Sequence, residues 1–378
     1  MKRLVVAASL CLLLPLDGVR LALDPLPVVS CFERGCRDWL DTDSNKIEAH
    51  GAGMLQSPTD GRWYWYGESK KTPHLADHGV NCYSSETLAG PWRFEGRVFS
   101  QEMMPKVVKG EIGPWVIERP KVLYNNNTSK FVMWFHLDKA SWNFFASQGY
   151  YSFRHAAVAT SPTPVGPFKF VHALQPDGIP SLDMSLWEDV DGQAYFVRSC
   201  NNAYMGISRL SPDYLNTTGL LSTGPCVEGM ALFRHPNGTL YMISSHLSGW
   251  RPNPLVLLRS DGPDLSDPQW TSMGNPTNSS VSFNSQPTFV VPYTQTQTFY
   301  DEDGIYHEDK VTHLIYMGDN WVNAGEGLIN ASYVWLPLRF PGGHAKLDEI
   351  WSWSMRDPFV QLRRNRSCQQ EDGLYRHS

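Results

Sequence analysis

The chain has 378 residues, of which 42% are hydrophobic and 19% charged, and its formal net charge is −6. This length and hydrophobic content are sufficient for one large core or two smaller ones, and they exclude a chain that is disordered over most of its length. Acidic residues exceed basic ones and no run is rich in Lys or Arg, so we expect no nucleic-acid partner.

Residues 1–22 have the features of a secretory signal peptide. Lys2 and Arg3 precede an apolar run, residues 4–16, that is too short to span a bilayer. An uncleaved anchor is the alternative, because no small-x-small cleavage site is distinct near Gly18 to Ala22. No later stretch is long and apolar enough to cross a membrane. We therefore expect a secreted, extracellular protein with no membrane partner.

Cysteines and glycosylation sequons agree with export. Once Cys11 is removed with the signal peptide, six cysteines remain, and the candidate pairs are Cys31 with Cys36, Cys200 with Cys226 and Cys82 with Cys368. A zinc site is disfavoured because no C-x-x-C pair occurs, so we expect neither a metal nor a cofactor. Sequons begin at Asn126, Asn127, Asn216, Asn237, Asn278, Asn330 and Asn365. The sequence thus predicts a glycoprotein with disulfide bonds.

After an irregular N-terminal extension, residues 23–46, short strands alternate with turns along the chain. The first unit is a hairpin, in which an apolar run from Ile47 is followed by a polar turn and the aromatic strand WYWY, ending at Glu68. Four similar aromatic strands follow: FVMWF (131–135), QAYFV (193–197), TLYMI (239–243) and HLIYM (313–317). The five aromatic strands predict five similar units.

Repeats and turns define the architecture of these units. The phrases AGPWRF (89–94) and VGPFKF (165–170) are two copies of one pattern, and Asp191-Gly192 and Asn237-Gly238 are typical hairpin turns. No stretch of a dozen residues has a capped helical period. About 70 residues per unit suit a four-stranded blade, so residues 47–359 are predicted to form an all-β, five-bladed β-propeller, followed by a polar tail at 360–378.

Four polar residues precede the candidate inner strands of different units: Glu118, Asp183, Glu228 and Gln286. The symmetry of a propeller would bring them together at one end of its axis. Carboxyl groups in such a cluster suit glycoside hydrolysis, which needs a proton donor and a second group that activates water or attacks carbon. A further acid nearby raises the pKa of the proton donor.

Aromatic residues in the predicted loops are candidate platforms for sugar rings, and these are Trp142, Trp250 and Trp321. Each candidate also has a structural alternative when it is considered alone. The Trp side chains could belong to the core, Glu118 could pair with Arg119 or Lys121 at the surface, and the other three positions could be turn residues or an edge charge. Only the occurrence of these candidate residues together, in this order along the chain, favours a functional site.

The motifs EAHGAGML, WYWYGES, ERPKVLYN, VMWFHLD, SLDMSLWEDVDGQAY, VEGMALF, HLSGWRPNP, SFNSQPTFV, YMGDNW and YVWLPL resemble glycoside hydrolase family 43, and most of all its exo-β-1,3-galactanases. The resemblance covers roughly residues 47–359. It implies a five-bladed propeller and inverting hydrolysis of galactan chains. By the same resemblance Glu228 is the general acid, Asp183 raises the pKa of that acid, Glu118 binds substrate hydroxyls and Glu68 assists.

This branch departs from the rest of its family in the residue that serves as the base. Most of the family has an Asp at the start of the first blade, where this chain has His50-Gly51-Ala52-Gly53. The branch places Gln or Glu at the position of Gln286, and an ordinary amide is a poor proton acceptor. Either Gln286 positions the water or Glu118 is the base. We expect the former, with Asn284 and His50 among the substrate-binding residues, although His50 could instead be a core histidine or a ligand of an axial ion.

Other departures concern substrate preference. Gly229-Met230 follows the acid where the branch has Ala-Pro, Leu182 stands in place of an Arg, Arg251 stands in place of an Asp, and residues 141–154 lengthen a loop. We expect a monomeric enzyme that releases galactose from the non-reducing end of β-1,3-galactan, an oligo- or polysaccharide partner. The alternatives are a family 43 arabinofuranosidase or xylosidase, or a silent carbohydrate-binding propeller.

Overall fold

The computed structural model describes residues 39–72, 74, 77–140, 151–300, 306–322 and 328–341. Within these ranges the chain forms strands, short 3-10 turns and no α-helix, and none of their segments is a helix that could span a membrane. The predicted signal peptide, Cys31, Cys36, Trp142, Asn365, Cys368 and the polar tail lie outside the described residues.

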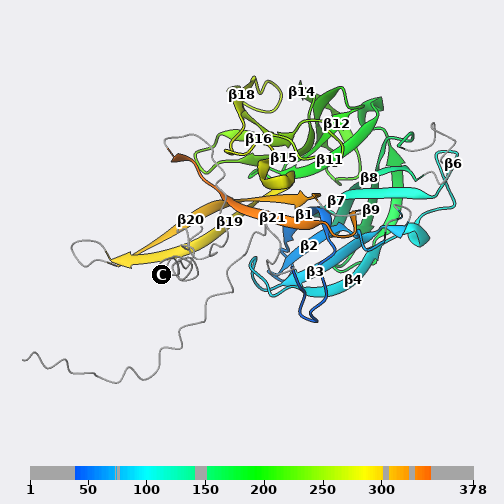
Figure 1. Ribbon diagram of the computed structural model, residues 1–378, viewed down its shortest axis with the longest axis horizontal. Helices are drawn as coiled ribbons and strands as arrows, with labels where there is room; N and C mark the ends of the chain where they lie inside the picture. The colour runs from blue at the N-terminus through cyan, green and yellow to red at the C-terminus, as the bar shows by residue number, and fades with distance from the viewer. Residues whose placement is uncertain are drawn as a thin grey trace, which may run out of the picture.

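The strands form five antiparallel sheets around a common axis, which confirms the predicted five-bladed propeller (Figure 1). Blade one contains β1 (His50–Gln56), β2 (Trp63–Glu68), β3 (Val80–Ser85) and β4 (Arg93–Phe99). Blade two contains β7 (Trp115–Asn125), β8 (Lys130–Lys139), β9 (His155–Ser161) and β10 (Lys169–Leu174). Blade three contains β11 (Ser181–Glu188), β12 (Ala194–Cys200), β13 (Tyr204–Leu210) and β14 (Thr217–Gly224).

Blade four contains β15 (Glu228–Arg234), β16 (Leu240–Ser245), β17 (Leu255–Ser260) and β18 (Trp270–Gly274). Blade five has three strands among the described residues instead of the expected four: β19 (Ser285–Tyr300), β20 (Tyr306–Asn320) and β21 (Ser332–Leu338). Figure 1 shows the β19–β20 hairpin projecting beyond the ring. A small hairpin, β5 (Val107–Val108) with β6 (Glu111–Ile112), and the 3-10 turns η2 (Gln101–Met103), η3 (Pro176–Gly178) and η4 (Ser282–Asn284) complete the described elements.

The five aromatic strands of the sequence are the second strands of the blades, β2, β8, β12, β16 and β20. β2, β12 and β16 are buried at every residue, because both faces of each sheet pack against neighbouring blades. This two-sided burial explains why these strands are continuous apolar and aromatic runs. The inner strands β1, β7, β11, β15 and β19 contact one another in sequence order, and β19 returns to β1 to close the ring.

The described part of the N-terminal extension, residues 39–46, packs where blades one and five meet. The Trp39 ring lies 5.9 Å from that of Trp65 and 4.9 Å from that of Trp335. Lys46 forms an isolated β-bridge with Leu40, which turns this segment back on itself. The extension therefore covers the seam at which the first and last blades close the ring.

The pairing of Cys200 with Cys226 was wrong. Cys200 is a buried free thiol on β12, whereas Cys226 is exposed and its thiol donates to the backbone oxygen of Asn202 at 3.3 Å. Cys82 is a free, buried thiol on β3, and its suggested partner Cys368 is not among the described residues.

Candidate functional site

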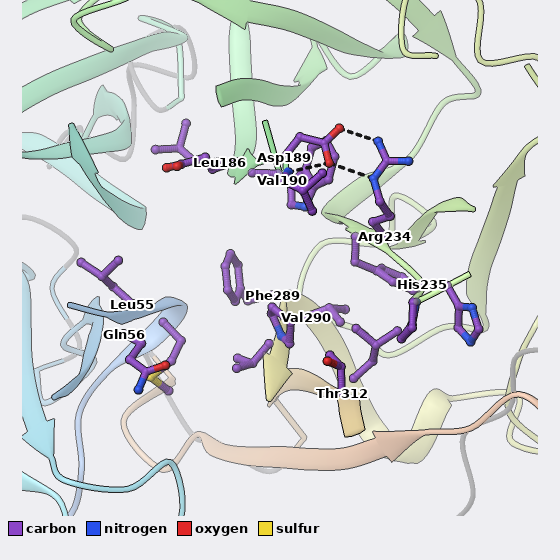
Figure 2. Close-up of a pocket in the computed structure, with 18 of the residues that line it drawn as sticks. Leu55, Gln56, Leu186, Asp189, Val190, Arg234, His235, Phe289, Val290 and Thr312 are labelled. Atoms are coloured by element: carbon purple, nitrogen blue, oxygen red, sulfur yellow. Dashed lines mark hydrogen bonds and ion pairs between the residues drawn. The ribbon is translucent and has the colours of Figure 1, made fainter. Parts of the chain in front are cut away.

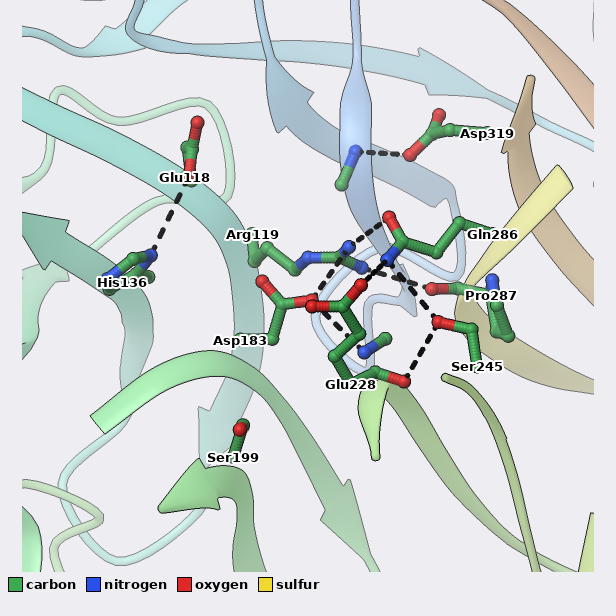
Figure 3. A network of polar contacts seen from close by, with 12 residues as sticks. Glu118, Arg119, His136, Asp183, Ser199, Glu228, Ser245, Gln286, Pro287 and Asp319 are labelled. Atoms are coloured by element: carbon green, nitrogen blue, oxygen red, sulfur yellow. Dashed lines mark hydrogen bonds and ion pairs between the residues drawn. The ribbon is translucent and has the colours of Figure 1, made fainter. Parts of the chain in front are cut away.

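The four polar residues that precede inner strands meet in one pocket. Glu118, Asp183, Glu228 and Gln286 all line a cavity of about 270 Å³ at the end of the propeller where the inner strands begin. They come from four different blades, as Figure 3 shows. The structure therefore brings together the residues that the sequence placed 45 to 65 positions apart.

A β-bulge at the start of each inner strand directs these side chains into the pocket. The pairing register shifts between His50 and Gly53, Glu118 and Lys121, Ser181 and Met184, Glu228 and Ala231, and Pro287 and Phe289. An extra residue in one strand bends it and re-aims the local side chains. The repetition of the bulge in all five blades explains why the candidate residues point to one place.

Glu228 opens β15, and most of its carboxyl group is shielded from water. Its Oε1 accepts a hydrogen bond from Gln286 Nε2 at 3.2 Å and lies 3.4 Å from the backbone nitrogen of Ser248. Burial and the neighbouring Asp183 carboxylate raise the pKa of Glu228 to about 7, although Arg119 opposes this. A carboxyl group with this pKa can donate a proton near neutral pH.

Asp183 is held by two donors that keep its carboxylate in place. Its Oδ2 accepts from the backbone nitrogen of Gly229 at 3.0 Å and from Arg119 Nη2 at 2.9 Å. Gly229 has a φ of +60°, and a Cβ at this position would lie 3.0 Å from Gln286 Cγ, so a side chain would be both strained and crowded. The glycine after the acid therefore lets Asp183 approach the backbone next to Glu228.

Arg119 lies at the centre of the site, and sequence reasoning had considered it only as a surface partner of Glu118. Its Nη2 lies 2.6 Å from Gln286 Oε1, and its Nη1 donates to the backbone oxygen of Pro287 at 3.0 Å (Figure 3). Its backbone nitrogen donates to Glu68 Oε2 at 2.8 Å. Its φ of +53° belongs to the bulge of β7. This conformation turns Arg119 inward, so it crosslinks blades one, two, three and five.

The amide orientation of Gln286 follows from its partners. Its Oε1 accepts from Arg119 and, at 3.0 Å, from Trp321 Nε1, and both of these groups can only donate. Its Nε2 faces Glu228 Oε1 and, at 3.3 Å, Ser245 Oγ. With both acceptor positions of Oε1 occupied, Gln286 is held as an ordinary amide in direct contact with Glu228.

Glu118 is buried and is surrounded by donors. Tyr151 donates to its Oε1 at 2.8 Å, Lys70 Nζ lies 3.4 Å from Oε1, and His136 Nδ1 lies 3.6 Å from Oε2. Burial alone would raise the pKa of Glu118, but Lys70 and His136 outweigh burial and hold this pKa well below its usual range. Glu118 therefore stays ionised, which makes it a strong acceptor for hydroxyl groups and a weak base.

The partners of Glu118 are themselves fixed by a buried network. His136 Nε2 lies 3.0 Å from Asp138 Oδ2; burial alone would lower the pKa of His136, but Asp138 and Glu118 raise it to about 10. Lys70 Nζ lies 2.9 Å from Glu68 Oε1. Glu68 thus supports Lys70 and Arg119 from behind and does not line the pocket itself.

Two further candidates also lie away from the pocket. His50 is fully buried, with its Nδ1 3.1 Å from Asp319 Oδ1 and its ring stacked 4.6 Å from that of Tyr333, which is the arrangement of a core histidine. Asn284 ends η4 and lines a small neighbouring cavity next to Gln286. In the described conformation neither side chain reaches the main pocket.

Of the three candidate tryptophans, Trp250 has the position of a sugar platform. It lines the pocket and is 41% exposed, and its ring meets that of Trp321 edge to face at 5.2 Å. Trp321 is buried and serves Gln286 as a hydrogen-bond donor. Trp142 lies outside the described residues.

A second, larger cavity of about 760 Å³ opens at the other ends of the inner strands (Figure 2). Its walls are mostly apolar, with Leu55, Leu186, Phe289 and Val290 among the lining residues. Asp189 accepts from Arg234 Nε at 2.8 Å, so this carboxylate is already paired. Glu188 is the other acid among the described lining residues, and burial raises its pKa. The smaller pocket instead holds three acids from different blades, Glu118, Asp183 and Glu228, and so better suits glycoside hydrolysis, which needs two.

Sequence reasoning missed Arg119, Lys70, His136 and Tyr151 as members of the site. One signal was available, because His136 and Asp138 are two positions apart in the strand WFHLDK and so point to the same face. Lys70, two residues after Glu68, lies just beyond the end of β2. Its contact with Glu118 depends on the packing of two blades and leaves no local pattern.

Comparison with known proteins gives relatives among solved structures. The exo-β-1,3-galactanase from Phanerochaete chrysosporium, solved with galactose, is 31% identical over 87% of this chain and 68% of that chain, with a TM-score of 0.70. The exo-β-1,3-galactanase from Clostridium thermocellum is 30% identical over 89% of this chain and 68% of that chain, with a TM-score of 0.68. A family 43 β-1,3-galactosidase with galactodeoxynojirimycin is 28% identical over 87% of this chain and the whole of that chain, with a TM-score of 0.68.

No family model matches the chain, and no curated protein matches it significantly. The structural relatives nevertheless share 30% identity over most of both chains, together with the five-bladed fold. The chain therefore belongs to glycoside hydrolase family 43, with a fold like that of its exo-β-1,3-galactanases, and it is a glycoside hydrolase.

Proposed function

We propose that this chain is an exo-acting, inverting β-1,3-galactosidase that releases galactose from the non-reducing end of β-1,3-galactan chains, and that it acts as a monomer. The observation that carries the proposal is Glu228, a shielded carboxyl group with a pKa near 7 in the same small pocket as two further acids. Solved relatives hold galactose, β-1,3-galactotriose or galactodeoxynojirimycin.

In this mechanism Glu228 protonates the oxygen of the leaving group. Asp183 favours the protonated form of Glu228 by charge repulsion, and Arg119 and the Gly229 amide hold Asp183 in place. Ionised Glu118 accepts hydroxyl hydrogens of the terminal sugar. Inversion requires the attacking water to approach on the face opposite Glu228.

Gln286 is the residue that we assign to this water. Its amide is rigid, but its Nε2 contacts Glu228 directly at 3.2 Å. The assignment therefore requires the sugar to enter between the two side chains and replace their hydrogen bond. Nε2 would then donate to the water and orient it, and the proton that this water loses as its oxygen bonds to the sugar carbon passes to solvent water, since a fully occupied Oε1 has no acceptor position left for it.

The roles assigned to Gln286 and Glu118 predict different kinetic effects when each residue is replaced. Gln286→Ala should lower kcat by roughly 10²-fold or more with KM changed little, because orientation of the water matters only in the transition state. Glu118→Gln should mainly raise KM, because a neutral amide accepts hydroxyl hydrogens less strongly. Steady-state kinetics on β-1,3-galactotriose measure both. The reverse pattern, with kcat lost only in the Glu118 variant, would make Glu118 the base.

Product analysis tests the substrate and the exo mode. We expect galactose as the sole early product from borohydride-reduced β-1,3-galactooligosaccharides, with the reduced end released last. Glu228→Gln, compared at equal folded concentration, should lower kcat by roughly 10²- to 10⁴-fold. Early release of longer fragments would contradict exo action. Hydrolysis of arabinan or xylan oligosaccharides in place of galactan would instead assign another family 43 specificity.

We also propose that the chain is secreted and glycosylated. The support is the N-terminal apolar run together with six sequon asparagines that are exposed in the structure: Asn126, Asn127, Asn216, Asn237, Asn278 and Asn330. Expression in eukaryotic cells should give a protein in the medium whose mass falls after treatment with peptide N-glycosidase. Retention in the cells without glycans would contradict this proposal.

A further inference from the structure

The acids around the pocket floor are already compensated by cations. Glu118 has Lys70 Nζ at 3.4 Å and His136 on its other oxygen, and Asp183 has Arg119 Nη2 at 2.9 Å. Each floor carboxylate that is ionised therefore has a cationic partner among the described residues. These cations offset part of the negative charge of the floor, with Lys70 shared between Glu118 and Glu68 and His136 shared between Glu118 and Asp138.

Arg154 adds a positive charge to the same pocket. It is half-buried and lines the cavity, where its Nε donates to the backbone oxygen of Tyr151 at 3.1 Å and its Nη1 donates to Asn201 Oδ1. Both acceptors are neutral, and no carboxylate within the described ranges pairs with this guanidinium. Its Nη2 group forms no hydrogen bond with the described residues, so Arg154 is a positioned cation with donor capacity to spare.

Two neighbouring side chains also present donors. Asn202 lines the pocket and is exposed; its Oδ1 accepts from Ser199 Oγ at 3.0 Å, which leaves Nδ2 as a donor. Arg251 follows Trp250 in the sequence and is exposed; it lines the small cavity that adjoins the pocket at Gly249 and Gln286, and it forms no ion pair with any described carboxylate. We call Arg154, Asn202 and Arg251 the cationic rim.

We propose that the cationic rim binds an acidic substituent, a carboxylate or a sulfate ester, carried by the galactan that enters the pocket. The proposal rests on the proposed galactosidase function and extends it to a substrate class. Guanidinium groups form charge-assisted, often bidentate hydrogen bonds with such groups. A neutral branch would gain only ordinary hydrogen bonds, whereas an acidic one would also be attracted by the guanidinium charges at short range, where they outweigh the screened repulsion from a protein of net charge −6.

Four synthetic substrates built on one trisaccharide test the proposal with the full-length protein. All are β-1,3-galactotriose: one unsubstituted, and three substituted at O6 of the second residue with glucuronic acid, with sulfate or with neutral glucose. We expect kcat/KM for either acid-bearing substrate to exceed that for the glucose-bearing one by about tenfold at low salt. This ratio should fall toward one as the ionic strength is raised.

Variants test whether the arginines of the cationic rim cause the preference for acid-bearing substrates. Arg154→Gln combined with Arg251→Gln should bring the acid-to-glucose ratio close to one, whereas Arg209→Gln, an exposed arginine on β13, should leave it unchanged. A preference for only one of the two acids would support the proposal and identify the group. A wild-type ratio of one, or a ratio that survives in the double variant, would overturn it. If the neutral trisaccharide is hydrolysed, such a result leaves the galactosidase function standing; hydrolysis of none of the four removes both.

Discussion

The pH dependence of activity should report the protonation of Glu228. A general acid must carry its proton, and burial together with Asp183 raises the pKa of Glu228 to about 7, so kcat/KM should fall as the pH rises through about 7. Asp183→Asn removes the charge that raises this pKa and should move the alkaline limb to lower pH. The profile of kcat/KM against pH measures both effects.

Asp189→Asn is a matched control, because Asp189 pairs with Arg234 at the opposite cavity. Asp189→Asn should leave the alkaline limb of the kcat/KM profile at the same pH as in the wild type. An alkaline limb that stays near pH 7 in Asp183→Asn would show that Asp183 does not set the pKa of the acid.

At the residue scale, the sequence predicted the pocket residues that lie directly on inner strands. Glu118, Asp183, Glu228 and Gln286 each precede or begin such a strand, and strand order alone brings them together. The contacts that orient these side chains and shift their pKa values depend on packing between blades. Arg119 joins Asp183 to Gln286 only because its bulge gives it a φ of +53°, and no local pattern in the sequence announces that conformation.

The bulges of the inner strands are the elements that build the site. Gly67 on β2 supports the first of them, since a Cβ added there would lie 2.1 Å from the backbone carbon of Ala49, which immediately precedes β1. Gly67→Ala should therefore force β1 away from β2 and lower the free energy of unfolding by about 3 kcal/mol or more. Urea unfolding followed by tryptophan fluorescence measures the change.

Gly61→Ala is the comparison for this variant. Its Cβ would meet nothing within 4 Å, and only its φ of +75° opposes a side chain, so a loss of about 1 kcal/mol is expected. Equal losses for the two variants would mean that the close approach of β1 and β2 is not the constraint.

Strands could be predicted from the sequence where burial gives them a recognisable hydrophobic pattern. The aromatic second strands, such as β8 and β12, are buried on both faces and so appear as continuous apolar runs. Outer strands were less predictable in this way, because an outer strand has one solvent-facing side and a weak pattern. β14, an outer strand with no fully buried residue, shows the same weakness.

At the scale of the whole molecule, the fold is complete only when the ring of blades closes. Asp319 on β20 joins blade five to blade one at this closure. Its Oδ2 accepts from the Gly51 amide at 2.7 Å and its Oδ1 lies 3.1 Å from His50 Nδ1. Asp319→Asn should lower the free energy of unfolding by about 3 kcal/mol, because a buried donor then faces an amide NH₂ group. Urea denaturation at pH 7 checks this loss.

The unfolding should remain a single transition, with circular dichroism and fluorescence coinciding, because each blade is buried against its neighbours. Asp261→Asn, at an exposed ion pair with Arg259, should leave the midpoint nearly unchanged. Two separate transitions in the Asp319 variant would show that the blades unfold as independent units.

We propose that Glu228 donates a proton in inverting cleavage of a terminal galactose. Proton NMR of the protein with β-1,3-galactotriose, followed from the first minutes, tests it most directly. We expect galactose to appear first as the α-anomer, and we expect Glu228→Gln, folded to the same extent, to release almost none. Galactose that appears first as the β-anomer, or a Glu228→Gln variant with wild-type turnover, would contradict it.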